Sequence, residues 1–308
     1  MRLIHIVTIL ALLLFSVTAN AQQQYPLLKK QVNFGGEKRS YSLYIPQNID
    51  LNASKKVPIV LVLHGGGGNG AVAAETTGFS AKAESEGFIA LYPDGSGRRL
   101  FNLNTWNVTH CCGYSMRKKN DDIGYISYLI DLVVEKYPID SNRIYVTGMS
   151  NGGMMTHVIG LRLADKVAAI APVMAGLFGD EVAPTIAMPT LIINGLQDKT
   201  FPMQGGLPAG PFSKSWDGTH LQQVKYQGEF WAKNNHCSLV VPEAQLTPLI
   251  SVWDYKCPAG APVIHYIVND NGHAWPGGKK GSRRGDKPST AMNATDVIWV
   301  FFSQQSLK

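Results

Sequence analysis

Short apolar runs recur along the chain, and most of them are rich in β-branched residues. They do not alternate with polar residues, which is typical of strands buried on both faces of a parallel sheet. Six such runs predict strands, over residues 59–63, 88–92, 144–147, 167–172, 191–193 and 263–268. A different pattern precedes them, because the runs 31–34 and 39–45 flank Gly35-Gly36 and predict an antiparallel hairpin.

Segments whose apolar residues have the spacing of a helix lie between the predicted strands. Residues 123–136 carry apolar side chains three and four positions apart, with Asp121 or Asp122 as the N-cap and Pro138 just past the end. Further helices are predicted over 71–86, 152–164 and 295–303. Strands that alternate with helices predict an α/β fold with a doubly wound, mostly parallel sheet, to which the N-terminal hairpin adds an antiparallel edge.

The first residues have the layout of a secretory signal peptide. Arg2 gives a positive start, residues 6–17 are almost wholly apolar, and Ala19-Asn20-Ala21 is a small-x-small cleavage site. The apolar run is shorter than the roughly 20 residues that a spanning helix needs, so we favour cleavage over an N-terminal membrane anchor. We expect a signal peptide over 1–21, a single domain over 22–308, a secreted or periplasmic location and no membrane contact after cleavage.

Composition and charge fit one large folded domain. The chain has 308 residues, of which 45% are hydrophobic and 16% charged, and this excludes a disordered chain. The formal net charge is +6, with basic clusters at 117–119 and 279–284 that lack interleaved aromatic residues. We therefore expect no nucleic-acid partner. Attraction to anionic polysaccharide stays open, as does the oligomeric state.

Four cysteines in an exported chain indicate disulfides. We predict a bond between Cys237 and Cys257, which flank an expected hairpin. The adjacent Cys111 and Cys112 are then either a vicinal bridge or free thiols. No C-x-x-C or H-x-x-x-H spacing is present, and we expect no metal site.

Residues 148–152 match the pattern G-x-S-x-G between a predicted strand and a predicted helix. A serine at so sharp a turn stands clear of the sheet, and the flanking glycines avoid clashes there. We therefore predict that Ser150 is a nucleophile.

A glycine run, His64-Gly65-Gly66-Gly67-Gly68, directly follows the predicted strand 59–63. Backbone N–H groups in such a loop stabilise an oxyanion, together with the N–H of the residue after the nucleophile. We expect Gly65, Gly66 and Asn151 to form this oxyanion hole. A phosphate-binding loop does not fit, because the run is not followed by G-K-[ST] and lacks the G-x-G-x-x-G context.

The acid and the histidine of such a site follow later strands, in the order Ser, acid, His. Asp198 lies just beyond the strand 191–193 and His273 follows the strand 263–268, whereas His157 and His265 fall inside elements and are expected to be structural. In this hypothesis His273 is the general base and Asp198 orients it, so that Ser150 attacks an ester carbonyl. No metal or organic cofactor is required.

The chain resembles the polyhydroxybutyrate depolymerase and feruloyl esterase family, which is related to carbohydrate esterase family 1 of the α/β-hydrolase superfamily. The resemblance covers nearly the whole mature chain. It rests on His64-Gly65-Gly66-Gly67-Gly68, Trp106-Asn107 with Cys111-Cys112-Gly113, residues 121–124 and 148–153, Asn194-Gly195-x-x-Asp198 and Gly272-His273-x-Trp275-Pro276-Gly277. It implies hydrolysis of carboxylic esters on polymeric or polymer-derived substrates.

Carried over to matching positions, the resemblance supports Ser150, Asp198 and His273 as the triad. It also implies that Trp106 and Trp275 line the acyl cleft, and we add His64 to this expected substrate-binding set.

The leading hypothesis is a secreted serine carboxylesterase that hydrolyses hydroxycinnamoyl (feruloyl) or acetyl esters of plant polysaccharide. The alternative is a polyhydroxyalkanoate depolymerase acting on short or amorphous chains. Extracellular polyester depolymerases commonly carry a further substrate-binding domain, whereas only a basic loop and one amphipathic helix follow His273. A prolyl-type peptidase would need a propeller or cap domain, and a non-catalytic binding protein would be expected to lose the triad or the glycine run.

Overall fold

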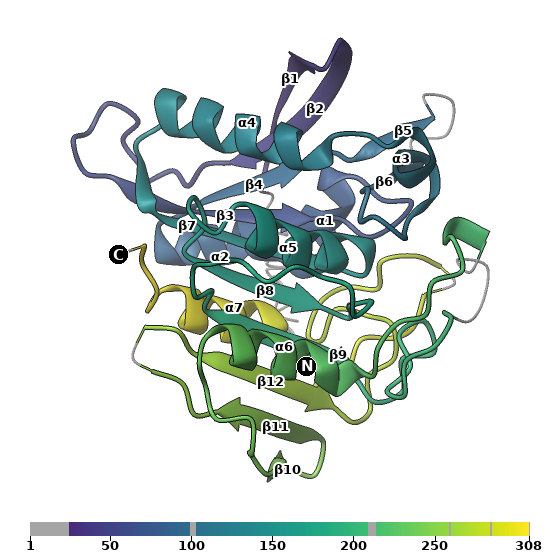
Figure 1. Cartoon of the computed structure of the whole chain (residues 1–308). Helices are drawn as coiled ribbons and strands as arrows, with labels where there is room; N and C mark the ends of the chain where they lie inside the picture. The colour runs from purple at the N-terminus through teal and green to yellow at the C-terminus, as the bar shows by residue number, and fades with distance from the viewer. Residues whose placement is uncertain (1–24, 99–102, 209–213, 259, 284, 308) are drawn as a thin grey trace, which may run out of the picture.

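The computed structural model describes residues 25–98, 103–208, 214–258, 260–283 and 285–307. The expected signal peptide lies outside these residues. Among them, a ten-stranded sheet has the order β1-β2-β4-β3-β7-β8-β9-β12-β11-β10 (Figure 1). Its strands are β1 (Leu28–Phe34), β2 (Glu37–Tyr44), β3 (Val57–Leu63), β4 (Ile89–Pro93), β7 (Ile139–Met149), β8 (Ala169–Val173), β9 (Thr190–Gly195), β10 (Ala244–Thr247), β11 (Ile250–Tyr255) and β12 (Val263–Val268).

The six central strands from β4 to β12 pair in parallel, and both edges of the sheet are antiparallel. The mostly parallel sheet with an N-terminal hairpin confirms the fold class predicted from the sequence. Two short strands, β5 (Ser96–Arg98) and β6 (Leu103–Thr105), form a separate antiparallel pair that the sequence pattern did not indicate.

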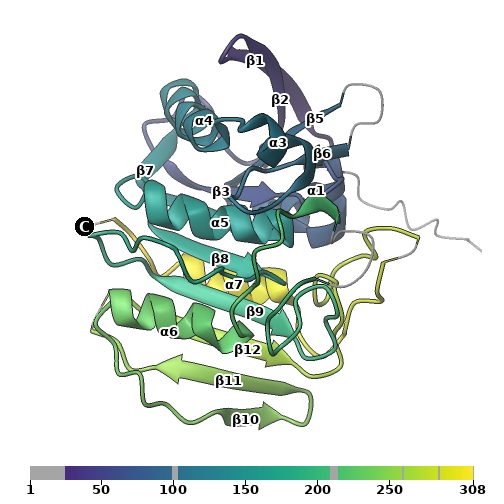
Figure 2. The same ribbon diagram turned by 45° about the vertical axis from the view of Figure 1, so that its right-hand side comes forward.

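Helices cover both faces of the sheet (Figures 1 and 2). They are α1 (Gly70–Thr77), α2 (Phe79–Glu86), α3 (Gly113–Lys118), α4 (Asp122–Lys136), α5 (Asn151–Arg162), α6 (Val224–Asn234) and α7 (Ala294–Phe302). The single helix expected over 71–86 is two helices, because Gly78 adopts a left-handed conformation (φ 74°) and ends α1. Asp121 caps α4 as expected, since its side chain accepts a hydrogen bond from Gly124 N.

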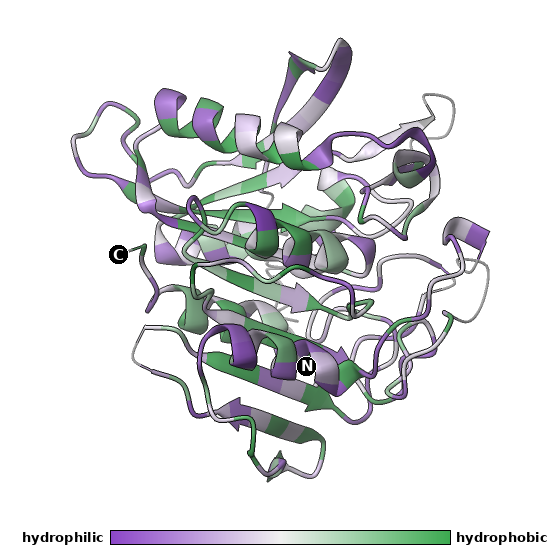
Figure 3. Cartoon of the chain, viewed as in Figure 1, coloured by the Kyte–Doolittle hydropathy of each residue, from purple (hydrophilic) through white to green (hydrophobic). Residues whose placement is uncertain are grey.

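The core has two layers, one on each face of the sheet. Along β3, Ile59, Leu61 and Leu63 pack in the layer under α4, α5 and α6, and the alternate residues Val60 and Val62 pack under α1, α2 and α7. Both sets are buried, which explains why the central strands read as continuous apolar runs. Figure 3 shows hydrophobic residues concentrated on these strands.

The parallel strands all end on the same edge of the sheet. Figure 2 shows the arrowheads of β8, β9 and β12 pointing to one side, where long loops gather. Ligands of open α/β sheets bind at this carboxyl edge. No helix in the described part of the chain has the length and apolarity that a membrane crossing requires.

Two disulfides are present in the structure. Cys237, just after α6, is bonded to Cys257, just after β11, as predicted. Cys111 is bonded to Cys112, which decides the alternative left open by the sequence in favour of a vicinal bridge.

Removing the Cys237–Cys257 bond by a double Cys→Ala substitution is expected to lower the free energy of unfolding by about 3 kcal/mol. The bond closes a loop across a sequence separation of 20 residues and restricts the unfolded chain. Urea denaturation of the oxidised proteins measures the loss. The same substitutions at Cys111 and Cys112 close no loop of comparable length and are the control. An equal loss in both double variants would contradict this account.

Candidate active site

Ser150 occupies a strained turn between β7 and α5. Its backbone has φ 59° and ψ −125°, a region that is unfavourable for residues with a side chain. Ser150 N donates to Val173 O (3.0 Å), which ties the turn to β8. A Cβ atom at Gly148 would lie 2.6 Å from Gly152 O, so this position requires glycine. The strand, turn and helix expected around the G-x-S-x-G motif are therefore present.

His273 lies between Ser150 and Asp198 and is hydrogen-bonded to both. The distance from Nε2 to Ser150 Oγ is 2.9 Å, and that from Nδ1 to Asp198 Oδ2 is 2.8 Å. Because a carboxylate only accepts, the neutral ring carries its proton on Nδ1 and leaves Nε2 free to accept from the serine hydroxyl. The structure thus brings together three side chains that are up to 123 positions apart in sequence.

Asp198 is held in place by its own loop. Its carboxylate is buried, and Oδ1 accepts from the backbone N–H groups of Thr200 (2.8 Å) and Phe201 (3.0 Å). The Phe201 ring stacks on the imidazole of His273 with a centroid separation of 5.5 Å and an interplanar angle of 16°. One oxygen of Asp198 is therefore committed to the loop and the other to the histidine.

Two residues that the sequence analysis missed position the histidine loop. Asp286 Oδ2 accepts from His273 N (2.7 Å). The buried Asn271 side chain donates to Gly272 O and Ala274 O (both 2.8 Å), and its backbone oxygen accepts from Gln197 N (3.0 Å). Asn271 therefore joins the histidine loop to the acid loop. Asp286 lies in a loop of mostly basic residues and belongs to no recognised motif, so no sequence pattern pointed to its role.

Asn151 and the glycine run both lie next to Ser150. Asn151 begins α5, and its side chain is locked by two bonds to the main chain of Trp106, at 2.7 Å and 3.0 Å. Gly66, like Asn151, lines the cavity at Ser150, and Gly65 lies against the serine. Gly67 N and Gly68 N are already bonded, to Asn104 O and Gly65 O.

His64 does not line the cavity, which corrects the substrate contact expected for it. The side chain is buried, Nε2 accepts from Gly95 N (2.9 Å), and Nδ1 therefore donates to Gly65 O (2.8 Å). Burial lowers the pKa of His64, so the ring is neutral near pH 7. Both ring nitrogens are used within the protein, where they hold the glycine run in place.

The two tryptophans expected in the acyl cleft are also packed inside the protein, and this expectation is wrong. Trp106 is fully buried and its Nε1 donates to His64 O (3.0 Å). Trp275 packs edge-on against Phe79, and its Nε1 donates to Thr295 Oγ1 (3.0 Å). Indole rings that find an internal acceptor for the N–H are stable in a core. Trp106 supports the glycine run, and Trp275 anchors the loop that follows His273.

Other side chains form the wall of the cavity, whose volume is about 630 Å³. Phe201 and Trp216 come from the long loop after β9, which lies outside the strands and helices predicted from the sequence. The cavity is also lined by Leu103, Tyr114, Cys112 and Arg117. The vicinal cysteine pair therefore contributes to the wall.

His157 and His265 are structural, as expected. His157 Nδ1 accepts from Trp231 Nε1 (3.0 Å) and Nε2 donates to Gln227 (2.8 Å), while His265 donates to Asn194 (3.1 Å). Burial lowers the pKa of His157 to about 4 and that of His265 to about 3, so both rings are neutral. Within the described ranges, no group of three His, Cys, Asp or Glu side chains is placed to hold a metal ion.

His110 clamps three loops beside the cavity. Its Nε2 bonds Asp180 (2.8 Å) and its Nδ1 bonds Asp217 (2.7 Å), next to Trp216. Burial lowers the pKa of His110, but the hydrogen bonds and charges of the two aspartates outweigh it, and the net pKa is raised. The two aspartates thus favour the protonated form of His110, and the hydrogen bond to Asp217 fastens the loop that carries Trp216.

The fold and the position of the site define this chain as an α/β-hydrolase. Residues 39–200, just over half of the chain, match the esterase PHB depolymerase family. The chain belongs to this family, which confirms the resemblance seen in the sequence.

Some of the relatives that match the chain are named as acetylxylan or feruloyl esterases, and others as polyester depolymerases. It is 29% identical to the bifunctional acetylxylan esterase/xylanase of Neocallimastix patriciarum, over 87% of this chain and 34% of that protein. It is 31% identical to feruloyl esterase B of Piromyces equi, over 66% of this chain and 37% of that protein. The poly(3-hydroxybutyrate) depolymerase of Ralstonia pickettii is 33% identical over 44% and 28%. The chain thus spans roughly a third of the length of these relatives.

Solved structures share the fold. The acetyl xylan esterase from Aspergillus awamori superposes with a TM-score of 0.58 at 18% identity, over 80% of this chain and 94% of that one. An S-formylglutathione hydrolase from Agrobacterium tumefaciens gives 0.56 at 12% identity, over 92% and 97%. The family match and the shared fold therefore agree with each other.

A His110→Gln substitution is expected to destabilise the protein most at low pH. Since the folded pKa of His110 is raised, its stabilisation is fully present below the unfolded value of about 6.5 and is lost as the pH rises through the folded pKa. The effect is at most about 1 kcal/mol, because the aspartates are exposed. Urea unfolding between about pH 5.5 and 9 measures it. The exposed His220→Gln is the control, and a pH-independent difference for His110→Gln would contradict the clamp.

Proposed function

We propose that this chain is a secreted serine carboxylesterase in which Ser150 is the nucleophile, His273 the general base and Asp198 the orienting acid. The observation that carries the proposal is the continuous hydrogen-bonded chain from Ser150 Oγ through His273 to the buried Asp198. Its position at the carboxyl edge of a parallel sheet supports the same assignment. The N-terminal pattern of the sequence supports export.

The first half of the reaction forms an acyl-enzyme. Ser150 Oγ attacks the ester carbonyl while His273 Nε2 takes the hydroxyl proton, and Asp198 stabilises the imidazolium that results. The negative charge that develops on the carbonyl oxygen is met by the N–H of Asn151 and by the glycine run, for which we propose Gly65 and Gly66. The tetrahedral intermediate then expels the alcohol, which receives the proton from His273.

The second half repeats these steps with water. His273 Nε2 takes a proton from water as its oxygen attacks the acyl carbon, and the acid is released when Ser150 Oγ recovers the proton. Because Asp198 is fixed by Thr200 N and Phe201 N, the imidazole keeps one orientation through both halves. No step needs a metal or an organic cofactor.

The volume and the lining of the cavity favour a substrate with an aromatic acyl group. Its volume of about 630 Å³ is within the usual range for small-molecule sites, and the rings of Phe201, Trp216 and Tyr114 line it. Flat rings of this kind stack on a hydroxycinnamoyl group. Together with the names of the relatives, this favours feruloyl esters of plant polysaccharide, with acetyl esters next. The relative from Ralstonia pickettii keeps polyester hydrolysis as the second candidate.

Ser150→Ala and His273→Ala are each expected to reduce kcat by about four orders of magnitude or more while the proteins stay folded. Triad members act as a unit, so the double variant should be little worse than either single one. Hydrolysis of p-nitrophenyl acetate and circular dichroism are the measurements, and Ser238→Ala is a control away from the site. Additive losses, or near-normal turnover by Ser150→Ala, would reject the assignment.

Trp216→Ala is expected to lower kcat/KM for methyl ferulate about tenfold, because it removes one ring beside the acyl group. The loss on p-nitrophenyl acetate should be much smaller, since an acetyl group has no ring that could stack on an indole. Wild-type protein should also prefer methyl ferulate or acetylated xylo-oligosaccharides to hydroxybutyrate oligomers. Ready clearing of polyhydroxybutyrate films with no action on hydroxycinnamates would reverse this preference and leave the esterase assignment in place.

A further inference from the structure

A second and larger cavity lies beside the serine cavity. Its volume is about 1400 Å³, above the range usual for a single small ligand. The β1–β2 hairpin forms one wall, and the segment after β4 with the β5–β6 pair forms the other. We call it the hairpin groove. It meets the serine cavity at Tyr114, which lines both.

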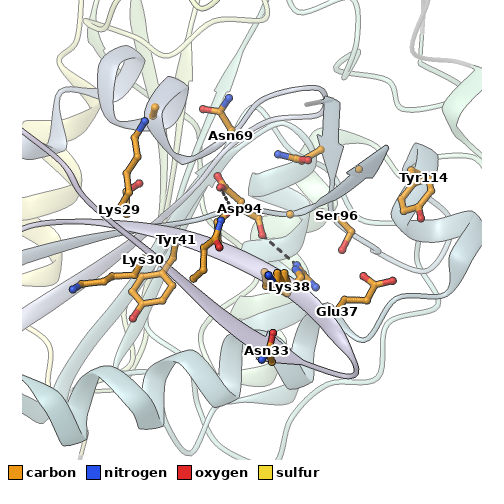
Figure 4. A pocket seen from close by; sticks show the side chains of 18 of the residues that line it. Lys29, Lys30, Asn33, Glu37, Lys38, Tyr41, Asn69, Asp94, Ser96 and Tyr114 are labelled. Atoms are coloured by element: carbon orange, nitrogen blue, oxygen red, sulfur yellow. Dashed lines mark hydrogen bonds between the residues drawn. The ribbon is translucent and has the colours of Figure 1, made fainter. Parts of the chain in front are cut away.

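Figure 4 shows how the walls of the hairpin groove are arranged. Tyr114 and Ser96 lie at one end, Asp94 lies between, and Lys29 and Lys30 lie toward the other end. A chain whose ester group reached Ser150 would pass Tyr114 and continue along this groove. The volume of the groove, and the residue Tyr114 that it shares with the serine cavity, suit the part of a polymer next to the ester.

Two buried polar atoms at the groove have no hydrogen-bond partner among the described residues. Ser96 is 5% exposed and its Oγ is unpaired, and Arg39 is 7% exposed and its Nε is unpaired. Arg39 is otherwise well bonded, to Asp122 at 2.8 Å and to Asp94 O at 3.2 Å. Both atoms have almost no accessible surface, so they are enclosed in the wall of the groove and do not contact a ligand directly.

The charge balance of the groove favours an anion. Lys29, Lys30 and Lys38 line it, and none of them makes an ion pair within the part of the chain that the structure describes. Of the two acidic residues, Asp94 is already committed, because its oxygens accept from Gly70 N (2.6 Å) and Ser40 Oγ (2.5 Å). Glu37, the other acidic residue, makes no ion pair among the described residues, so three lysine ammonium groups share the groove with one free carboxylate and leave a positive excess.

The remaining lining suits a sugar better than a lipid or a nucleic acid. Gln31, Asn33 and Asn104 supply amide groups that both donate and accept, as sugar hydroxyls require. Nucleic-acid grooves combine basic residues with a series of stacking aromatic rings. Among the described residues that line this groove, the aromatic ones are Tyr41 and Tyr114, and Glu37 is also present.

We propose that the hairpin groove binds the carbohydrate chain that carries the ester, and that Lys29, Lys30 and Lys38 select chains bearing carboxylate groups, such as uronic acids. The amide groups of Gln31, Asn33 and Asn104 hydrogen-bond the sugar hydroxyls. The proposal rests on the proposed function only for the link between groove and ester. Binding of the carbohydrate itself does not require Ser150.

The test uses wild-type protein and xylo-oligosaccharides that carry no ester, so that binding is measured apart from hydrolysis. Isothermal titration calorimetry at low salt compares a glucuronic-acid-substituted oligosaccharide with a neutral one of the same length. The acidic ligand should bind about tenfold more tightly, and added salt should remove the difference. Equal binding of the two, or equal competition by a short DNA strand, would overturn the proposal.

Two kinds of variant test the charged and the uncharged polar groups of the groove separately. Replacing Lys29, Lys30 and Lys38 together by Ala should bring the acidic ligand down to the affinity of the neutral one. Replacing Lys55, Lys56 and Lys136 removes the same charge from exposed positions away from the groove and should keep the preference. Asn33→Ala should weaken both ligands about fivefold and keep their ratio. A control variant that loses the preference as fully as the groove variant would overturn the proposal.

Hydrolysis of p-nitrophenyl acetate by the wild-type protein distinguishes the two proposals. Selective binding of the acidic oligosaccharide without any esterase activity would reject the proposed function and leave the groove as a carbohydrate site. Esterase activity without selective binding would reject the groove and leave the function.

Discussion

Ser150 has a backbone conformation that is costly for a residue with a side chain, and close packing around it holds it there. β3, β7 and α5 approach so closely that Gly152 and Gly148 leave no space for a Cβ atom. The same contact brings the glycine run after β3 against Ser150 and places Asn151 at the start of α5. The arrangement of serine and N–H groups therefore follows from how three elements pack, and not from flexible loops.

A second shell of buried polar contacts supports this arrangement. His64 and Trp106 hold the glycine run and each other, and the side chain of Asn151 binds the backbone of Trp106. On the other side, Asn271 joins the acid and histidine loops. Aromatic and amide groups with all their polar atoms paired keep a single geometry, which is what a preorganised site needs.

The two cavities near Ser150 differ in the chemistry of the residues that line them. The one bounded by Phe201 and Trp216 is aromatic, and the hairpin groove is polar and lysine-rich. An ester between an aromatic acid and a sugar has the same division. The cavities are built by two elements that are far apart in the chain, the late loop after β9 and the N-terminal hairpin, and Tyr114 lines both cavities.

The sequence by itself determined the parallel sheet, the hairpin and the residues at the ends of β7, β9 and β12, because buried strands and tight glycine turns leave local patterns. It also determined which cysteines pair across the β10–β11 hairpin. Only the tertiary structure decided the roles of His64, Trp106 and Trp275. A large or polar side chain near a motif has the same local signal whether it faces a cavity or the core, and the neighbours that fill its hydrogen bonds come from distant parts of the chain. The same reason hid Trp216, Asp286 and the hairpin groove.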